Sequence, residues 1–345
     1  MTANLLRQRE DPTWLAATAE WVEQKLAERG IALTSSPAEV RVLPWSAVYR
    51  FPTMTGDVYF KACAPSQGFE PALMCYLAER RPGDVLPVLA ADLGRAWLLM
   101  PDGGPVLSDV LQEDVADIAR HWSMVLGRLA DLQIDLSQDV GRLLALGVPD
   151  RRPEILPALY RELLARPERL LHDAPEALTA DDLPKLRALL PRVEAVCAEL
   201  AASGPPVTLV HDDLHDGHIF VRLGENTSYV FFDYGDACIS HPFVQMVSAQ
   251  RFWPIRSSIQ PDHVTVEHLY GVYLSRWDVS MAVAERRRAL DLALAVGTIV
   301  RALTWINAVG SYLDEVGAEL RARYARGVAY WMRALLERVD GLDGG

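Results

Sequence analysis

Apolar residues in the first hundred positions follow two different periods along the chain. Between residues 14 and 30 they recur at three- and four-residue steps, which predicts a helix that ends at Gly30. Strand-like runs follow at 40–51 and 58–62, separated by turn residues, and a further helix is expected at 69–81. We therefore expect helix and strand to alternate in this part of the chain.

Two shorter apolar runs, at 85–91 and 96–100, flank a turn-like Asp-Leu-Gly. Together with the preceding elements they give the order helix, hairpin, helix, hairpin. This order indicates a small antiparallel sheet that carries one helix.

The pattern changes at residues 101–105, where two glycines and two prolines fall within five positions. Such a segment is typical of a hinge between domains. We therefore expect one domain at 1–101 and a second at 102–345. The second is predicted to be mainly helical, with short strand-like runs between 207 and 233, so the expected fold class is α+β.

The balance of charge excludes one class of partner. The chain has 345 residues, of which 34 are basic and 46 acidic, so its formal net charge is −12. Half of the residues are apolar, as in an ordinary globular protein. Because no basic surplus exists to displace counterions, we do not expect a nucleic-acid partner.

The sequence also suggests where the protein works. Its first residues are charged too early for a secretory signal, and the most apolar stretch, 289–306, contains Asp291 and Arg301. We therefore expect no membrane partner. The four cysteines lie far apart without metal-binding spacing, which favours reduced thiols in a cytoplasmic protein. Nothing in the sequence specifies an oligomeric state.

Candidate chemistry is concentrated in two short segments, HDDLHDGH at 211–218 and FDYGD at 232–236, which hold eight aspartates and histidines. Such clustering is costly in self-repulsion unless a cation or a reaction uses it. One chemistry that fits is phosphoryl transfer, with one carboxylate accepting a hydroxyl proton and another holding magnesium on the phosphates. Metal-assisted hydrolysis is the alternative, with His211, His215 and His218 gathering a transition metal. Histidines four residues apart share a face only on a helix, whereas the glycine here indicates a loop.

The amino-terminal half favours phosphoryl transfer. The chain contains 3 lysines against 31 arginines, so a lysine within a strand, Lys61, calls for an explanation. A nucleotide-dependent transferase needs such a cation for the triphosphate and an acid to orient it. Glu70 follows at the head of the next helix, and Glu79 is a competing candidate. The apolar run that ends in Leu99 and Met100 would border an adenine slot beside the hinge.

These features together resemble the aminoglycoside phosphotransferase and choline kinase-like family. HDDLHDGH resembles its H-G-D-x-H-x-x-N catalytic loop, and FFDYGDA resembles its I-D-W/F-x-D/G metal motif. The resemblance implies a two-lobed protein-kinase-like fold, with a nucleotide-binding lobe at 1–101 and a catalytic and acceptor-binding lobe at 102–345. It also implies a kinase that uses ATP or GTP, with Mg²⁺ or with Mn²⁺ in its place, to phosphorylate a small hydroxylated metabolite or antibiotic-like molecule.

The resemblance further implies a role for each matching residue. Asp213 matches the catalytic aspartate that takes the acceptor's proton, and Asp233 matches the aspartate that chelates magnesium. Lys61 matches the lysine that contacts the α- and β-phosphates, and Glu70 is its expected partner. His211 matches a histidine that supports the catalytic loop.

One position departs from the family pattern. His218 stands where the family usually has an asparagine that helps to hold magnesium, and imidazole suits manganese or zinc better than magnesium. The departure leaves a second hypothesis, a nucleotide-binding regulator that is catalytically weak or inactive. A metal-dependent hydrolase is the third. The segment 44–49 is expected to cover the phosphates, with Ser46 as a hydrogen-bond donor.

The acceptor pocket is expected between the catalytic loop and the carboxy-terminal helices. The candidate substrate contacts are His215, Asp216, Tyr234 and Asp236. Trp253, Arg301 and Trp305 are expected nearby, although tryptophans at helical spacing are more often core residues. The identity of the acceptor is left open.

Overall fold

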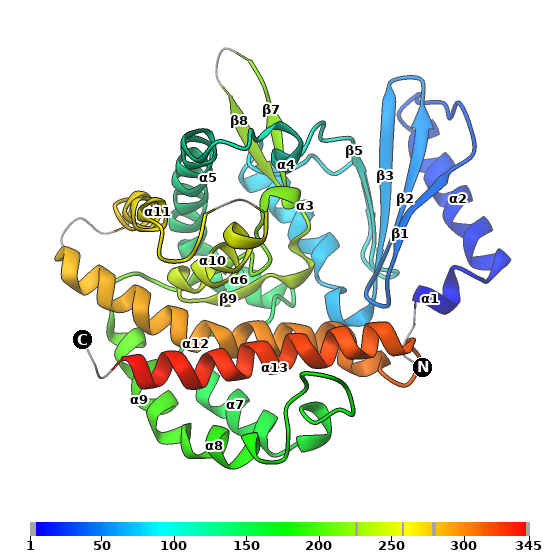
Figure 1. The fold of residues 1–345 in the computed structure, drawn as a ribbon. Coiled ribbons are helices and arrows are strands. Elements are labelled where there is room, and N and C mark those ends of the chain that lie inside the picture. Colours follow the sequence, from blue (N-terminus) through cyan, green and yellow to red (C-terminus); the bar gives the residue numbers. More distant parts are fainter. Residues whose placement is uncertain (1–4, 225–226, 257–258, 278–280, 343–345) are drawn as a thin grey trace. The chain divides into compact units, whose positions relative to one another are not determined.

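A computed structural model describes residues 5–224, 227–256, 259–277 and 281–342 (Figure 1). The chain divides into two compact units. The first comprises Met1–Leu107 and Gly217–Gly235, and the second comprises Ser108–Asp216 and Asp236–Gly345. These units differ from the predicted division at 101/102, because residues 102–107 and 217–235 group with the first unit. The nucleotide-binding and acceptor-binding roles assigned to the two parts stay predictions.

Among the described residues, the first unit contains a five-stranded antiparallel sheet in the order β1-β2-β3-β5-β4, a separate β7–β8 hairpin and the α-helices α1, α2 and α3. Its helices and strands are α1 (Leu5–Gln8), α2 (Pro12–Ala27), β1 (Ala38–Val42), β2 (Ser46–Thr53), β3 (Gly56–Cys63), α3 (Glu70–Arg80), β4 (Ala90–Asp92), β5 (Trp97–Pro101), β7 (Ile219–Arg222) and β8 (Ser228–Phe231).

One local expectation is wrong. The run at 40–51, predicted as a single strand, forms two antiparallel strands, β1 and β2, in which Val42 pairs with Ala47. The turn between them is closed by a hydrogen bond from Leu43 N to Ser46 O at 2.8 Å. Pro44 explains the break, because its fixed φ and missing N–H favour a turn over a continued strand. Ser46 begins β2, and the covering of the phosphates by the segment 44–49 stays a prediction.

Helix α2 packs on the sheet through aromatic side chains (Figure 1). Its start is set by Asp11, whose carboxylate accepts a hydrogen bond from Thr13 N at 2.8 Å. The Trp21 ring lies 6.0 Å from that of Phe60 and 5.6 Å from that of Trp97, in edge-on geometries. Contacts of this kind add specific geometry to the burial of apolar area, so they fix the helix against β3 and β5.

The segment predicted as a hinge is packed against the β7–β8 hairpin within the first unit. Val221 N donates to Pro105 O at 2.9 Å. A Cβ at Gly103 would lie 2.2 Å from the Phe220 ring, so this close approach requires glycine.

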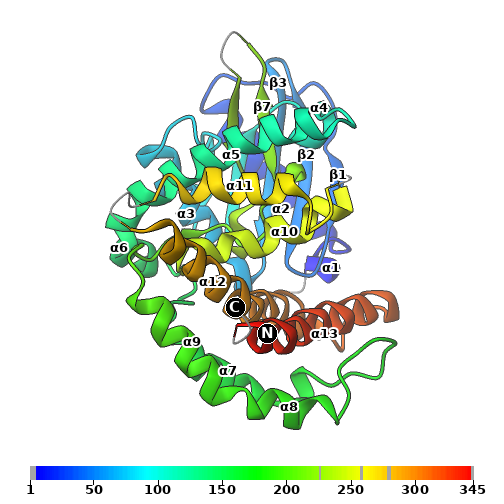
Figure 2. The same ribbon diagram turned by 60° about the vertical axis from the view of Figure 1, so that its left-hand side comes forward.

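The described part of the second unit is mostly helical, with a two-stranded sheet, β6–β9. Its helices and strands are α4 (Leu107–Val110), which begins at the boundary, α5 (Val115–Leu136), α6 (Val140–Ala145), α7 (Leu156–Leu164), α8 (Asp182–Ala188), α9 (Leu190–Ala202), β6 (Thr208–Val210), β9 (Cys238–Ser240), α10 (Gln245–Arg256), α11 (Val264–Leu274), α12 (Val283–Val309) and α13 (Ala318–Gly341). Figures 1 and 2 show α12 and α13 side by side, and α11 alongside α5.

Helix α12 forms the centre of the second unit. By length and composition it could cross a membrane, contrary to what its charged residues led us to expect, but 78% of its most apolar stretch is buried within the protein. Such burial is typical of a core helix. One charged side chain is buried in this helix, that of Arg301.

Candidate active site

A buried lysine forms the first group of candidate residues. Lys61 lies on β3 between β2 and β5, and 6% of it is exposed. Its Nζ atom lies 2.6 Å from Glu70 Oε2 at the start of α3 and 2.6 Å from Asp233 Oδ1. Glu79, the competing partner, is exposed. The predicted pairing with Glu70 is therefore present in the structure, and Asp233 completes a triad.

The Lys61 ammonium offsets the charges of both carboxylates in this triad. Burial would lower the pKa of Lys61, but the carboxylates of Asp233 and Glu70 raise it above its ordinary value. Burial likewise works against the charged form of Asp233, yet the Lys61 ammonium and the neighbouring His218 hold its pKa well below the usual range. Burial raises the pKa of Glu70, against the opposing effect of Lys61. The Cys63 thiol donates to Glu70 Oε2 at 3.3 Å and helps to satisfy this buried acid.

The β7–β8 hairpin brings His218 and Asp233 together. Ile219 pairs with Phe231, so the residues that flank the hairpin lie opposite each other, and Phe232 N donates to His218 O at 3.2 Å. As a result, His218 Nε2 lies 3.3 Å from Asp233 Oδ2. Asp233 has a φ of 64°, a left-handed conformation that is uncommon outside glycine and often found at functional sites.

A further basic side chain faces the same carboxylate. Arg41 on β1 places Nη2 3.7 Å from Asp233 Oδ2, and 54% of its side chain is exposed. Lys61, Arg41 and His218 thus surround Asp233, while Glu70 pairs with Lys61. These basic side chains can hold an anion such as a phosphate group through charge and hydrogen bonds. The ionised Asp233 oxygens and the neighbouring His218 imidazole are also suitable ligands for a divalent cation.

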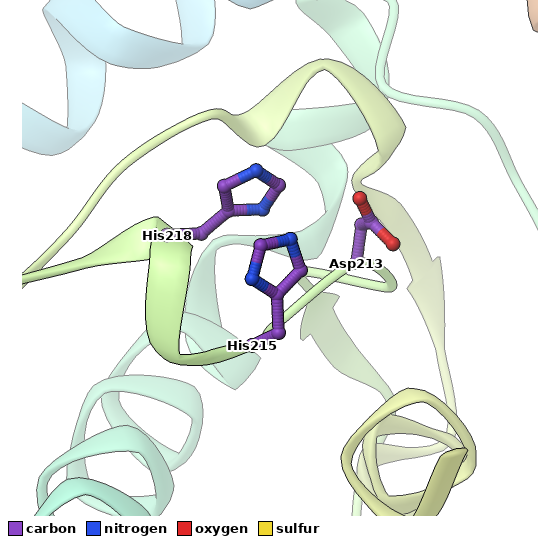
Figure 3. A group of neighbouring side chains, drawn as sticks. All are labelled: Asp213, His215 and His218. Atoms are coloured by element: carbon purple, nitrogen blue, oxygen red, sulfur yellow. The ribbon is translucent and has the colours of Figure 1, made fainter. Parts of the chain in front are cut away.

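The second group of candidate residues lies on the loop after β6, in the second unit. Figure 3 shows Asp213 and His215 on this loop, and His218 where the 3₁₀ turn Asp216–His218 ends. Asp212 has a φ of 63°, and Asp213 N donates to His211 O at 2.8 Å, so the backbone turns sharply here. His211 is buried, and its backbone N donates to Gln245 Oε1 at 2.9 Å.

A buried arginine from α12 binds three carboxylates of the second unit. Arg301 Nη2 lies 2.9 Å from Asp213 Oδ1, and Nη1 lies 3.2 Å from Asp212 Oδ2 and 3.6 Å from Asp236 Oδ2. Burial would lower the pKa of Arg301, but these carboxylates raise it above its ordinary value. Burial raises the pKa of Asp212, against the effects of Arg301 and of a hydrogen bond from Thr304.

The predicted acceptor contacts divide between the two units, and their contact with an acceptor stays a prediction. The His215 ring is tilted against that of Phe252, with 4.7 Å between ring centroids, and its Nδ1 lies 3.6 Å from an oxygen of the buried Asp216. Tyr234 is buried in the first unit, where burial raises its pKa, and Asp236 belongs to the second unit.

Two predicted tryptophan neighbours of the acceptor lie in helices. Trp253 is buried and packs against Trp122 and Tyr270, so it is a core residue. Trp305 is half-buried on α12, with the Arg323 guanidinium 5.6 Å from its ring.

The predicted nucleotide contacts outside the triad are buried strand residues. Ser46 begins β2, and its carbonyl oxygen already accepts from Leu43. Leu99 and Met100 lie on β5, paired with Phe60 and Tyr59. Their proposed contacts with a nucleotide stay predictions.

Three contributions were not predicted from the sequence. Arg41 belongs to no motif, and its position depends on how β1 pairs with β2. Cys63 lies two residues after Lys61 in the same strand, so the strand period alone could have placed it on the lysine's face. Arg301 was expected near an acceptor pocket, but its binding to three aspartates was not predicted, because it depends on the position of α12 in the fold.

Known proteins resemble this chain over most of its length. Residues 44–279 match the model of the Phosphotransferase enzyme family. No curated protein matches the chain by sequence. Plasmodium vivax ethanolamine kinase is similar in structure, with a TM-score of 0.65 and 14% identity over 96% of this chain and 91% of that one.

Two further solved structures show the same likeness. A macrolide 2'-phosphotransferase type I has a TM-score of 0.59 and 16% identity, covering 90% of this chain and 97% of its own. The GDP and kanamycin complex of APH(2")-IIia has a TM-score of 0.55 and 17% identity, covering 93% and 98%. These likenesses confirm the predicted protein-kinase-like fold class, with a small antiparallel sheet and a mostly helical remainder.

Proposed function

The chain belongs to the phosphotransferase enzyme family, and from this premise we propose that it moves the γ-phosphoryl group of ATP or GTP to a hydroxyl group of a small molecule. The observation that carries the proposal is the triad in which Lys61 and Glu70 are buried and Asp233, with 23% of its side chain exposed, faces the lysine. Burying charged side chains such as Lys61 and Glu70 is costly, and strongly perturbed charges in such settings cluster at functional sites.

The first unit would hold the donor phosphates. Lys61 would bind the α- and β-phosphates, oriented by Glu70, and Arg41 would add a second positive charge at the same carboxylate. GDP-bound structures among the similar proteins support a nucleoside phosphate as the ligand.

A divalent cation belongs to this proposal. Asp233 is the residue we expect to hold Mg²⁺ or Mn²⁺, with His218 as the second candidate ligand, and the ionised state of Asp233 fits this role. When bound, the ion would offset the negative charge of the phosphates.

Asp213 would act on the acceptor. Its side chain is 23% exposed, so it can be reached by a small alcohol, and its carboxylate would accept the proton as the hydroxyl attacks phosphorus. Phosphoryl transfer requires little covalent chemistry from the protein, and most of the rate is expected from positioning and charge.

The acceptor class is proposed from chemistry and from the similar proteins. Their names refer to ethanolamine, a macrolide and kanamycin, all small molecules with hydroxyl groups. We therefore propose a small hydroxylated acceptor.

The test is a nucleotide-consumption screen over hydroxylated metabolites and antibiotics, with ATP or GTP and with Mg²⁺ or Mn²⁺. We expect acceptor-dependent release of ADP or GDP. Asp213→Asn should lower turnover by about 10²–10⁴-fold while leaving nucleotide affinity within about threefold. Asp131→Asn is the matched control, because Asp131 also pairs with an arginine, Arg276, at 2.6 Å but on the surface.

The outcome separates the proposed function from its alternatives. Nucleotide binding without transfer to any acceptor would favour a nucleotide-binding regulator. The absence of both nucleotide binding and transfer would contradict the proposal.

A further inference from the structure

Arg301 is unusual among the arginines of this chain because its guanidinium is buried within an apolar helix. It is 4% exposed, and the other buried residues of α12 are uncharged. A buried guanidinium destabilises a fold unless carboxylates and hydrogen bonds compensate for the lost hydration. Here three aspartates compensate for the buried charge, those at 212, 213 and 236.

The two ends of the guanidinium fork have different partners. Nη1 donates to the Asp212 carbonyl oxygen at 2.6 Å and lies 3.2 Å from that residue's carboxylate. Nη2 donates to Asp213 Oδ1 at 2.9 Å. Because the guanidinium is planar and rigid, fixing one end fixes the direction of the other. Arg301 therefore sets the position of the Asp213 carboxylate relative to the Asp212 peptide.

Neighbouring groups hold the guanidinium itself in place. Thr304 lies three residues further along α12, on the same face, and donates to Asp212 Oδ2 at 2.7 Å. From α13, the Trp331 ring lies 5.8 Å from the Arg301 guanidinium carbon. Arg301 and Thr304 thus bind a residue with a left-handed backbone, Asp212, whose conformation needs support from its surroundings.

The charges indicate what happens without Arg301. Three carboxylates surround one guanidinium, so a neutral residue at 301 would leave negative groups facing one another at reduced exposure. The loop would relieve this repulsion by turning Asp213 away. If Arg301 had only a structural role, it would need only to compensate the charges of the aspartates. Its geometry also fixes the direction of one carboxylate oxygen, Asp213 Oδ1.

We propose that Arg301 is a positioning residue for Asp213, a role that rests on the proposed phosphotransferase function. It holds Oδ1 of the proposed catalytic base and, through the Asp212 carbonyl, the loop that carries it. The exposed part of the Asp213 carboxylate then faces the acceptor hydroxyl. Arg301 does not contact the donor phosphates in this proposal.

The experiment compares Arg301→Ala and Arg301→Lys with wild type and with Arg288→Ala. Arg288 is a matched control, because it lies on the same helix and binds Glu199 through two nitrogens, at 2.7 and 3.0 Å, on the surface. Two kinds of measurement are made on the folded fraction of each protein. Steady-state kinetics gives kcat and the nucleotide KM, and hydrogen–deuterium exchange gives the exchange rates of the amides at 211–216.

We expect Arg301→Ala to lower kcat by about 100-fold or more, with the nucleotide KM changed by less than about threefold and with faster exchange at 211–216. Arg301→Lys keeps the charge but lacks the fork, so its kcat should fall between those of wild type and Arg301→Ala, and it serves as the test if Arg301→Ala does not fold. Arg288→Ala should match wild type.

Other outcomes would overturn the proposal. One is a kcat within threefold of wild type in a folded Arg301 variant. Another is a loss of kcat that disappears once the folded fraction is taken into account. If the wild type consumes no nucleotide with any acceptor, the phosphotransferase function fails, and the exchange measurement decides whether Arg301 holds the loop: unchanged exchange overturns this role, and faster exchange supports it.

Discussion

Lys61 Nζ lies 2.6 Å from Asp233 Oδ1, although the two residues are 172 positions apart in the sequence. The contact is made within the first unit, because the hairpin at 217–235 packs with the amino-terminal residues. Lys61 on a strand and Asp233 on a loop thereby form one group of charged side chains with Glu70. The following predictions concern this group, its surroundings and one buried histidine.

Replacing Glu70 with glutamine should weaken the triad. Lys61 would lose one of its two carboxylate partners in a buried site, so we expect a loss of about 3 kcal/mol in the free energy of unfolding and a fall of about tenfold or more in kcat/KM for the nucleotide. Denaturant unfolding and steady-state kinetics check both values. Glu79→Gln, on the exposed face of the same helix, should change stability by less than about 0.5 kcal/mol. Equal effects of the two substitutions would contradict the assigned pairing.

Arg41→Ala should weaken the binding of ADP and ATP by about tenfold and leave adenosine binding unchanged. The reason is that Arg41 faces the carboxylate where the phosphates are expected, at 3.7 Å. Isothermal titration calorimetry with the three ligands separates phosphate contacts from base contacts. Arg50→Ala is the control, because Arg50 pairs with Asp57 at 3.2 Å on the neighbouring strand. A parallel loss for adenosine would argue against a phosphate contact.

His218→Asn should shift the metal preference toward magnesium. An amide oxygen is a harder ligand than an imidazole nitrogen, so we expect the Mg²⁺ concentration for half-maximal activity to fall and the ratio of Mg²⁺ to Mn²⁺ activity to rise by about tenfold. Metal titrations of nucleotide consumption measure both. His263→Asn makes the same chemical change at the start of α11 and should leave the ratio as in wild type. An unchanged ratio for His218→Asn would remove His218 from the metal site.

His241 should make the protein less stable in mild acid. Its Nδ1 accepts a hydrogen bond from Phe243 N at 3.3 Å, and its Nε2 lies 3.1 Å from Ser203 Oγ, so the buried ring is satisfied in its neutral form. Burial lowers the pKa of His241 to about 3. Below its ordinary pKa of about 6.5, the unfolded chain therefore binds a proton that the folded chain does not, and stability falls as the pH falls from about 6.5 toward 3.

From this difference we expect His241 to cost about 1.4 kcal/mol of stability between pH 7.5 and pH 5.5. His241→Asn keeps an acceptor for the Phe243 amide and should remove this share of the pH dependence, as measured by urea unfolding at the two pH values. His263, which accepts from Thr265 N at 3.1 Å at a half-buried position, provides the control variant His263→Asn. The same slope in His241→Asn and wild type would refute the assignment.

Much of the chemistry could be read from local sequence. The scarcity of lysine drew attention to Lys61, the position of Glu70 at a helix start favoured it over Glu79, and two short motifs indicated the family, which the comparisons confirm. The helices near 14–30 and 69–81 were also predictable, because the spacing of apolar residues acts within a few turns of chain. The roles of Asp213, Asp233 and His218 in catalysis and metal binding stay predictions.

Other features could not be read in this way. The pattern of apolar residues predicted a single strand at 40–51, because this pattern does not reveal the turn at Pro44. Strand β9 is three residues long, and the loop at 211–218 and the β7–β8 hairpin separate it in the sequence from its partner β6, so no local signal marks it.

Local spacing thus specified which residue types carry the chemistry and which faces of helices and strands they occupy. The partners of the charged groups depended on the path of the whole chain. Arg41 reaches Asp233 through the pairing of β1 and the position of the hairpin, and Arg301 reaches Asp213 through the packing of α12. The physical reason is that side-chain periodicity reports burial over a few residues, whereas an ion pair between distant residues requires the packing that brings their backbones together.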